Sequence, residues 1–200
     1  MRTAYAILYT IIWPFFSIFH PVKAIGREHI PEEGVLICAN HTALSDPLLL
    51  VFAFHRKFQI RVMAKAELLQ VPVIGWLLKK VGVFGVERGK SDVGAIKQAI
   101  RFLKGGENLL LFPEGTRVRE SRGEISSPKT GAAMLAIRTG VSILPVYIPE
   151  HKRWFRRTPV VIGEPYRPDV ASRKGSQEEY MAITKDLMDR IRALGAQVST

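Results

Sequence analysis

The chain has 200 residues, of which 47% are hydrophobic and 24% are charged, a composition typical of one globular domain with a proper core. Its formal net charge of +11 favours anionic partners, which include nucleic acid, acidic lipid surfaces, phosphorylated substrates and acidic carrier proteins. The single cysteine, Cys38, excludes an internal disulfide and a cysteine-based zinc site.

The amino-terminal segment is apolar and rich in aromatic residues. Residues 3–22 carry no charge when His20 is neutral. A signal peptide is disfavoured because residues 15–21 contain no small-x-small cleavage site. The run barely reaches the length of about 20 residues that a spanning helix needs, and Pro14 kinks or breaks it. We therefore predict that residues 1–21 form a membrane anchor that lies in, or dips into, one leaflet. The alternative is a buried helix of a soluble protein.

From residue 22 onward, apolar segments of strand length alternate with helical segments. The predicted strands are 22–26, 34–39, 59–65, 83–87, 108–112, 141–148 and 158–165. The predicted helices are 47–54, 73–81, a segment with Ser91 as N-cap that runs to about Leu103, 129–139 and 177–194. This alternation predicts one α/β domain over residues 22–200, with a mixed, largely parallel sheet covered by helices on both faces.

The segment NHTALSDP, residues 40–47, places His41 five positions before Asp46. On a helix this spacing separates two side chains by about 140°, so the pair shares no helix face. Asp46 followed by Pro47 is typical of a helix start with aspartate as N-cap, so His41 lies on the turn before that helix. Such a turn can fold back until the carboxylate meets one imidazole nitrogen, while the other faces the cleft at the end of the strand. The alternative is a helix cap beside an unrelated loop histidine.

Two further segments place cations and a permissive turn after predicted strands. In LLLFPEGTRVRE, Gly115 lets the backbone approach a ligand, Thr116 supplies a hydroxyl, and Arg117 supplies a planar fork suited to phosphate. The glycines of GVFGVERGKSD are one residue too close for a phosphate-binding P-loop, so we reject nucleotide hydrolysis. Arg88 in that segment remains a candidate phosphate contact. The alternatives are an ordinary surface turn and a solvated charge.

Two other features admit more than one interpretation. The segment EHKRWFRRTP, residues 150–159, interleaves Lys and Arg with Trp154 and Phe155. That pattern suits anionic lipid headgroups and also single-stranded nucleic acid, and the predicted anchor favours lipid. Cys38 lies three residues before His41, so a thiol nucleophile is considered, although a small thiol in an apolar strand is more often a core residue.

Taken in order, these motifs resemble the membrane-associated glycerolipid acyltransferases, in particular the bacterial 1-acyl-glycerol-3-phosphate acyltransferases. NHTALSD resembles the His-x4-Asp block of that family, and GVFGVER resembles its second block, which ends in Arg88. FPEGTR resembles the third block and ILPVYI the fourth. The resemblance covers about residues 26–165, and it departs from the family at Val118, where serine is frequent.

The resemblance implies a glycerol-3-phosphate acyltransferase-like fold and transfer of a fatty acyl group from acyl-CoA or acyl carrier protein. The acceptor is the free hydroxyl of 1-acyl-glycerol-3-phosphate, and the product is phosphatidic acid in phospholipid biosynthesis. His41 removes the hydroxyl proton and Asp46 supports it. The implied substrate-binding residues are Lys65, Arg88, Glu114, Gly115, Thr116 and Arg117. No metal, bound cofactor or nucleic acid is implied, and the expected location is the cytoplasmic face of the cell membrane, on an anionic lipid surface.

Three alternatives stay open. The acceptor could be glycerol-3-phosphate or another lysophospholipid instead. Cys38 could form an acyl-enzyme in a hydrolase or transferase. A non-enzymatic lipid or nucleic-acid binder has support only from the basic segments.

Overall fold

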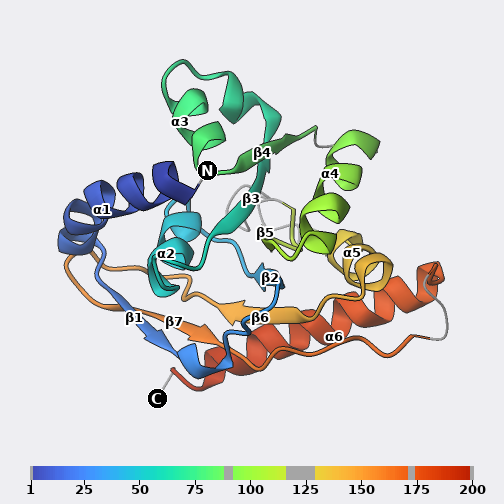
Figure 1. Ribbon diagram of the computed structural model, residues 1–200. Coiled ribbons are helices and arrows are strands. Elements are labelled where there is room, and N and C mark those ends of the chain that lie inside the picture. The colour runs from blue at the N-terminus through green and yellow to red at the C-terminus, as the bar shows by residue number, and fades with distance from the viewer. Residues whose placement is uncertain (1, 88–91, 116–128, 171–173, 199–200) are drawn as a thin grey trace.

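Short apolar segments form one central sheet in the computed structural model, which describes residues 2–87, 92–115, 129–170 and 174–198. Within these residues seven strands join in the order β1-β7-β6-β2-β5-β3-β4, as Figure 1 shows. Every neighbouring pair is parallel except β6 and β7. The strands are β1 (Val22–Ile25), β2 (Leu36–Ala39), β3 (Ile60–Lys65), β4 (Val83–Val86), β5 (Asn108–Leu111), β6 (Ile143–Tyr147) and β7 (Thr158–Ile162).

Helices connect these strands, and local signals set several of their ends. The N-cap residue of the helix after β4 is Asp92, one position after the predicted Ser91, because the Asp92 side chain accepts a hydrogen bond from the Ala95 N–H. Ser176 and Glu179 form a reciprocal capping box at the start of the last helix. The α-helices are α1 (Arg2–Phe19), α2 (Asp46–Ala53), α3 (Ile74–Lys80), α4 (Val93–Lys104), α5 (Gly131–Thr139) and α6 (Gln177–Ala196), and the 3-10 helices are η1 (Arg27–His29) and η2 (Ala66–Gln70).

The two faces of the sheet bury separate core clusters. Strand β2 is buried along its whole length and divides its side chains between them. Ile37 and Ala39 join the cluster that α2 covers, whereas Leu36 and Cys38 join the cluster under α4, α5 and α6. Figure 1 shows α1 and α2 on one side of the sheet and α4 to α6 on the other. The alternation of side chains along a strand therefore explains why a central strand must be apolar on both faces.

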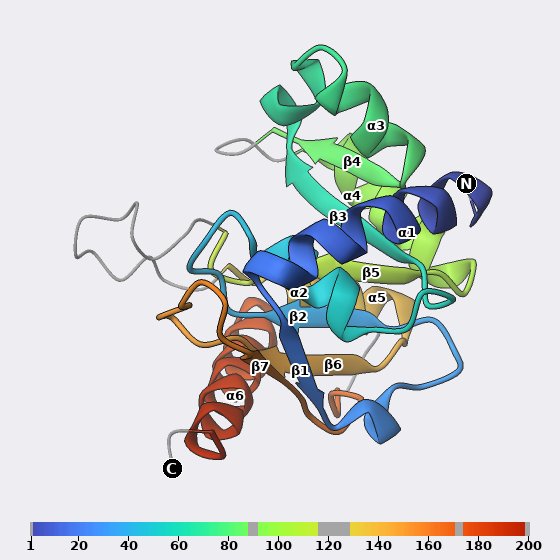
Figure 2. The ribbon, with the colours of Figure 1, turned by 90° about the vertical axis from the view of Figure 1, so that its left-hand side faces the viewer.

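The amino-terminal helix α1 packs along α2, in front of the sheet in Figure 2. Tyr5 is buried, and Tyr9 and Phe16 both contact the ring of Phe52 at centroid distances of 5.0 and 5.1 Å. The helix continues through Pro14. None of the described helices combines the length and the hydropathy that crossing a bilayer requires. One face of helix α1 therefore packs against the domain, while the other leaves large apolar side chains exposed, Phe15 among them.

The predicted α/β domain with a mixed, largely parallel sheet is confirmed. Each predicted strand and helix is found, with ends that differ by a few residues. The helix predicted from residue 129 begins at Gly131. The 3-10 turns η1 and η2 were not predicted, because single turns lack the periodicity that identifies longer helices.

Candidate active site

Three loops meet at one edge of the sheet, because β2 pairs in parallel with both β5 and β6. The carboxyl ends of parallel strands lie at the same edge, where α/β sheets bind ligands. The loops carry His41 after β2, Glu114 after β5 and Lys152 after β6. The first turn of α2 adds Asp46. Segments more than 100 residues apart in the sequence are thereby brought into contact, as between Thr42 and Lys152.

The structure brings His41 and Asp46 together. Nδ1 of His41 lies 3.0 Å from Oδ2 of Asp46, and the two side chains are 10% and 0% exposed. An ionised carboxylate can only accept hydrogen bonds, so Nδ1 carries the proton and the lone pair of the neutral ring lies on Nε2. Nε2 is therefore the nitrogen that can take a proton from a substrate.

The prediction that Asp46 serves as the N-cap of its helix is wrong. Helix α2 begins at Asp46 itself, and Ser45 is the N-cap residue. The carboxylate turns back toward the preceding loop, where Oδ2 also accepts hydrogen bonds from the backbone N–H groups of Thr42 and Ala43, both at 2.7 Å. Three donors converge on this one oxygen, which an exposed cap position does not offer.

The carboxylate of Asp46 is both fully buried and well compensated. Burial raises the pKa of Asp46, but hydrogen bonds from His41, Lys152 and Ala43 and the positive charge of Lys152 outweigh it, so the pKa lies below its ordinary value of 3.8. Nζ of Lys152 lies 2.8 Å from Oδ1. Asp46 is consequently ionised at neutral pH, which fixes the tautomer of His41.

The loop after β5 holds His41 from the other side. The imidazole stacks on the ring of Phe112, with centroids 4.0 Å apart and planes inclined by 19°. The backbone N–H of His41 donates to Oε2 of Glu114 at 2.9 Å. Burial raises the pKa of Glu114, opposed in part by this hydrogen bond. The FPEGTR segment therefore supports the His-x4-Asp segment directly.

Asn40 fixes the point at which the chain leaves β2. Its side-chain amide donates to the carbonyl of Ile148 at 2.7 Å, and its Oδ1 accepts from the Ile148 N–H at 2.8 Å. Both residues are buried. The pair of bonds continues the β2–β6 ladder past the last residue of β2 and sets the start of the His41 loop.

We expect Asn40→Ala to lower the free energy of unfolding by about 2–4 kcal/mol, since it leaves two buried backbone groups of Ile148 unpaired. Urea denaturation measures this change. The matched control is Gln98→Ala on the exposed face of α4, which we expect to change stability by less than about 0.5 kcal/mol. Equal changes in the free energy of unfolding for the two substitutions would show that the Asn40 hydrogen bonds do not stabilise the fold.

Comparison with known proteins places this arrangement in a family. A family model described as Acyltransferase matches residues 21–149. The chain belongs to this acyltransferase family.

Two relatives and one solved structure are similar to this acyltransferase over long stretches. The 1-acyl-sn-glycerol-3-phosphate acyltransferase of Bacillus subtilis is 33% identical over 182 residues, which are 86% of this chain and 87% of that protein. The protein of the same name from Borreliella burgdorferi is 37% identical over 133 residues, or 65% of this chain, and the match spans only 52% of that relative. The crystal structure of the 1-acyl-sn-glycerophosphate acyltransferase PlsC from Thermotoga maritima has a TM-score of 0.69 at 26% identity and covers 100% of this chain and 80% of its own.

The structure places Gly115 and Lys65 differently with respect to the site. Gly115 adopts a left-handed φ of 71°, and its N–H donates to the carbonyl of Phe112, which closes the turn after β5. A Cβ there would lie 3.0 Å from Cε of Lys129, so this side chain packs against the turn. Nζ of Lys65 lies 3.1 Å from Glu67, and both side chains are more than half exposed. Lys65 stands at the end of β3, and its described ion pair is with Glu67 and not with the His41–Asp46 pair.

Three predicted substrate contacts lie outside the described residues. They are Arg88, Thr116 and Arg117. Their roles remain predictions, and they follow β4 and the Gly115 turn in the sequence. The described parts of these segments end at Glu87 and Gly115.

Cys38 is poorly placed to act as a nucleophile. Its side chain is fully buried in the cluster beneath α4, α5 and α6, and burial raises the pKa of its thiol. A nucleophilic cysteine needs an accessible thiolate. The geometry therefore disfavours the acyl-enzyme alternative.

Sequence reasoning missed three residues that hold the site together. Asn40 and Phe112 are the first residues of the NHTALSDP and FPEGTR segments, but their contacts with Ile148 and His41 have no sequence signature. Lys152 was included in the basic segment predicted to face lipid, yet its side chain is only 5% exposed and pairs with Asp46. The only signal for it was its place just after a buried strand of the sheet.

A cavity of about 470 Å³ lies beside the loop that follows β2, where Thr42, Ala43 and Ser45 line it. Polar, basic and aromatic side chains line it, among them His20, Ser45, Lys152, Arg153 and Trp154. Among the residues that the structure describes, no group of three His, Cys, Asp or Glu side chains is placed to hold a metal ion.

Proposed function

We propose that this acyltransferase transfers a fatty acyl group from acyl-CoA or acyl carrier protein to the free hydroxyl of 1-acyl-glycerol-3-phosphate, giving phosphatidic acid for phospholipid biosynthesis. Relatives at 33% and 37% identity carry the name of this activity, as does the Thermotoga structure. The single observation that carries the chemistry is the 3.0 Å contact between Nδ1 of His41 and Asp46, because it leaves Nε2 as the basic nitrogen.

The reaction needs a base, since an alcohol is a poor nucleophile at neutral pH. The acceptor oxygen attacks the thioester carbonyl carbon as its proton passes to Nε2 of His41. The C–S bond then breaks, and the proton passes from His41 to the departing thiolate. One ester and one thiol result. Asp46 stabilises the imidazolium that exists between the two transfers. General-base assistance of this kind is worth about 10²–10⁴ in rate.

The test is an assay of the purified protein in lipid that crosses acceptors with donors. The donors are acyl-CoA and acyl carrier protein loaded with the same acyl chain. The acceptors are 1-acyl-glycerol-3-phosphate and glycerol-3-phosphate. We expect phosphatidic acid from the first acceptor with at least one donor, and a much lower kcat/KM with glycerol-3-phosphate. Preference for glycerol-3-phosphate would contradict the proposal.

A second acceptor class has support from one relative. The lyso-ornithine lipid O-acyltransferase of Pseudomonas aeruginosa is 36% identical over 121 residues, which are 59% of this chain and 44% of that protein. The same assay with lyso-ornithine lipid decides between the two. Because this acceptor lacks a phosphate, we expect it to be the poorer substrate if cations of the site bind phosphate. A higher kcat/KM with lyso-ornithine lipid than with 1-acyl-glycerol-3-phosphate would make lyso-ornithine lipid the preferred acceptor and contradict the first proposal.

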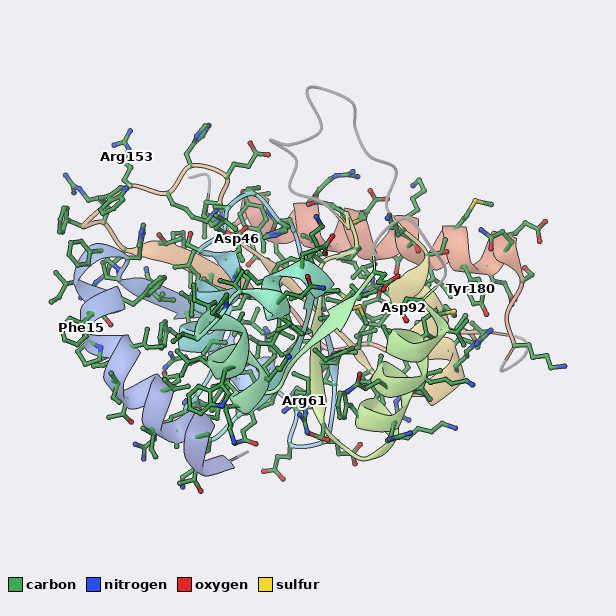
Figure 3. All side chains as sticks on the ribbon, turned by 90° about the horizontal axis from the view of Figure 1, so that it is seen from above. Phe15, Asp46, Arg61, Asp92, Arg153 and Tyr180 are labelled. Atoms are coloured by element: carbon green, nitrogen blue, oxygen red, sulfur yellow. The ribbon has the colours of Figure 1, made fainter. Side chains whose placement is uncertain are left out.

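We further propose that the protein works on an anionic membrane surface, at the cytoplasmic face. Helix α1 leaves Ile7, Ile11, Phe15 and Ile18 between 53% and 67% exposed. Figure 3 shows Phe15 on α1 and Arg153 on the loop after β6 at the same end of the molecule. Trp154 and Phe155 on this loop contact Phe19 of α1. An apolar helix face beside a basic, aromatic loop supports contact with one leaflet.

Vesicle sedimentation tests the membrane proposal. We expect stronger binding to vesicles that contain phosphatidylglycerol than to pure phosphatidylcholine, with binding weakened by salt. Phe15→Glu should weaken binding at least about tenfold, because burying one large apolar side chain contributes about 1.5–3 kcal/mol. Met181→Glu on α6, where Met181 is 52% exposed, is the matched control and should have little effect. Equal binding by both variants would rule out the α1 face as the contact.

A further inference from the structure

A buried ammonium group stands behind the His41–Asp46 pair. Lys152, on the loop after β6, has a side chain that is 5% exposed. Its Nζ lies 2.8 Å from Oδ1 of Asp46 and donates to Oγ1 of Thr42 at 2.6 Å. Lysine is almost never buried to this degree without a partner, and here both contacts are with the His41 loop and its carboxylate.

The two oxygens of Asp46 have separate sets of partners. Oδ2 accepts from Nδ1 of His41 and from the backbone of Thr42 and Ala43, whereas Oδ1 faces Lys152. A carboxylate held at only one oxygen can rotate about its Cβ–Cγ bond. With Lys152 at Oδ1, rotation would break contacts at both oxygens, so the orientation of Oδ2 toward His41 is fixed.

Stability alone does not account for this ion pair. Removing two charges from water costs several kcal/mol per ion, so a buried pair is often no more stabilising than apolar residues of similar size. The charge has a second effect, because it offsets part of the negative potential that Asp46 exerts on the imidazole. Without that offset, Asp46 would attract the imidazolium form of the ring more strongly.

We propose that Lys152 is a positioning residue for acyl transfer, which fixes the carboxylate of Asp46 and thereby sets the orientation of His41 and the net charge that faces its ring. The inference rests on the proposed function only in taking His41 as the base. It assigns to this residue of the basic segment a role inside the site, separate from lipid contact.

The first test follows the protonation of the His41 ring directly and does not require an acyl-transfer assay. An NMR titration of the histidine side chains compares the wild type with Lys152→Met, and His41→Gln assigns the signal. Other titratable or charged groups face this region from each packed element: His20 just after α1, Glu114 from the β5 loop, and Glu150, His151 and Arg153 from the loop of Lys152. These groups are the same in the wild type and in Lys152→Met, so they do not account for a difference between the two titrations. We expect the His41 titration in Lys152→Met to move to higher pH than in the wild type, and in Asp46→Asn to move to lower pH.

The second test measures kcat and KM against pH. Lys152→Met should lower kcat by up to about 10²-fold, because misplacement of a catalytic group by about 1 Å has effects of that size. The acid limb of its kcat profile should move to higher pH, while KM stays near the wild-type value. Lys152→Arg, which keeps the charge, should restore the position of the acid limb. Lys97→Met on the exposed face of α4 is the matched control for loss of one lysine and should match the wild type.

The outcomes separate the two proposals. A His41 titration that does not move in folded Lys152→Met overturns the role of Lys152, whatever the enzyme acylates. A shift of the titration without acyl transfer by the wild type supports the role of Lys152 and contradicts the proposed function. If Lys152→Met does not fold, Thr42→Val removes one of the two lysine contacts and should shift the titration of His41 in the same direction by less. No shift in Thr42→Val would then overturn the proposal.

Discussion

Replacing His41 with Gln is expected to lower kcat for acyl transfer about 10²- to 10⁴-fold, the range that general-base assistance contributes. Gln keeps a planar polar side chain beside Phe112 but offers no basic nitrogen. The KM for the donor should change little, because the proposed role of His41 concerns the acceptor hydroxyl. Initial rates at saturating substrate measure the effect.

The stability of the His41→Gln protein must be measured together with its activity. Asp46 keeps its ion pair with Lys152 and the two backbone donors of Thr42 and Ala43, so we expect a thermal midpoint close to that of the wild type. His55→Gln changes an exposed histidine just beyond α2 and is the matched control, with activity unchanged. A His41→Gln protein as active as His55→Gln would remove His41 from the mechanism.

Asp46→Asn should have two large effects at once. Asparagine can present its N–H to Nδ1 of His41 and so favour the tautomer with the proton on Nε2, and the equivalent substitution in a serine protease triad lowers kcat about 10⁴-fold. It also leaves the ammonium of Lys152 buried without its counter-ion. Breaking a buried ion pair in this way costs about 3–5 kcal/mol of stability. Kinetics and urea denaturation on one preparation measure both effects.

The same residue predicts how stability depends on pH. Because the pKa of Asp46 in the folded protein lies below its ordinary value of 3.8, its contribution to stability is present above that value and is lost as the pH falls through the lowered pKa. The wild type should lose stability on acidification through this range more steeply than Asp46→Asn. Parallel stability profiles would show that Asp46 is not selectively stabilised in its ionised form.

The sheet was predictable from the sequence because its strands are buried on both faces. The segment GVLICA is continuously apolar, as a central parallel strand requires, and its last four residues form β2. The fold-back of Asp46 toward His41 was also predictable, because Asp-Pro marks the helix start and leaves the histidine on the turn before it. The identity of the N-cap residue was not predictable, because the Asp46 carboxylate accepts three hydrogen bonds from the preceding loop, and N-cap preferences do not take such loop donors into account.

Long-range contacts account for what the sequence did not reveal. Lys152 looks like its basic neighbours, and only the parallel pairing of β2 with β6 brings it to Asp46. Helix α1 reads as apolar on every face, and only its packing on Phe52 shows which face is inward. Neither fact is encoded in local spacing, because each depends on residues that the fold brings together from distant parts of the chain.

The most direct test of the account is a structure of the protein with 1-acyl-glycerol-3-phosphate bound and no donor present. The quantity to measure is the distance from Nε2 of His41 to the free hydroxyl oxygen of the acceptor. We expect a hydrogen-bonding distance of about 2.6–3.2 Å, with Nδ1 of His41 still bonded to Asp46. A hydroxyl held elsewhere in an ordered complex, or a ring turned so that Nε2 points away from it, would contradict the role of His41 as the base.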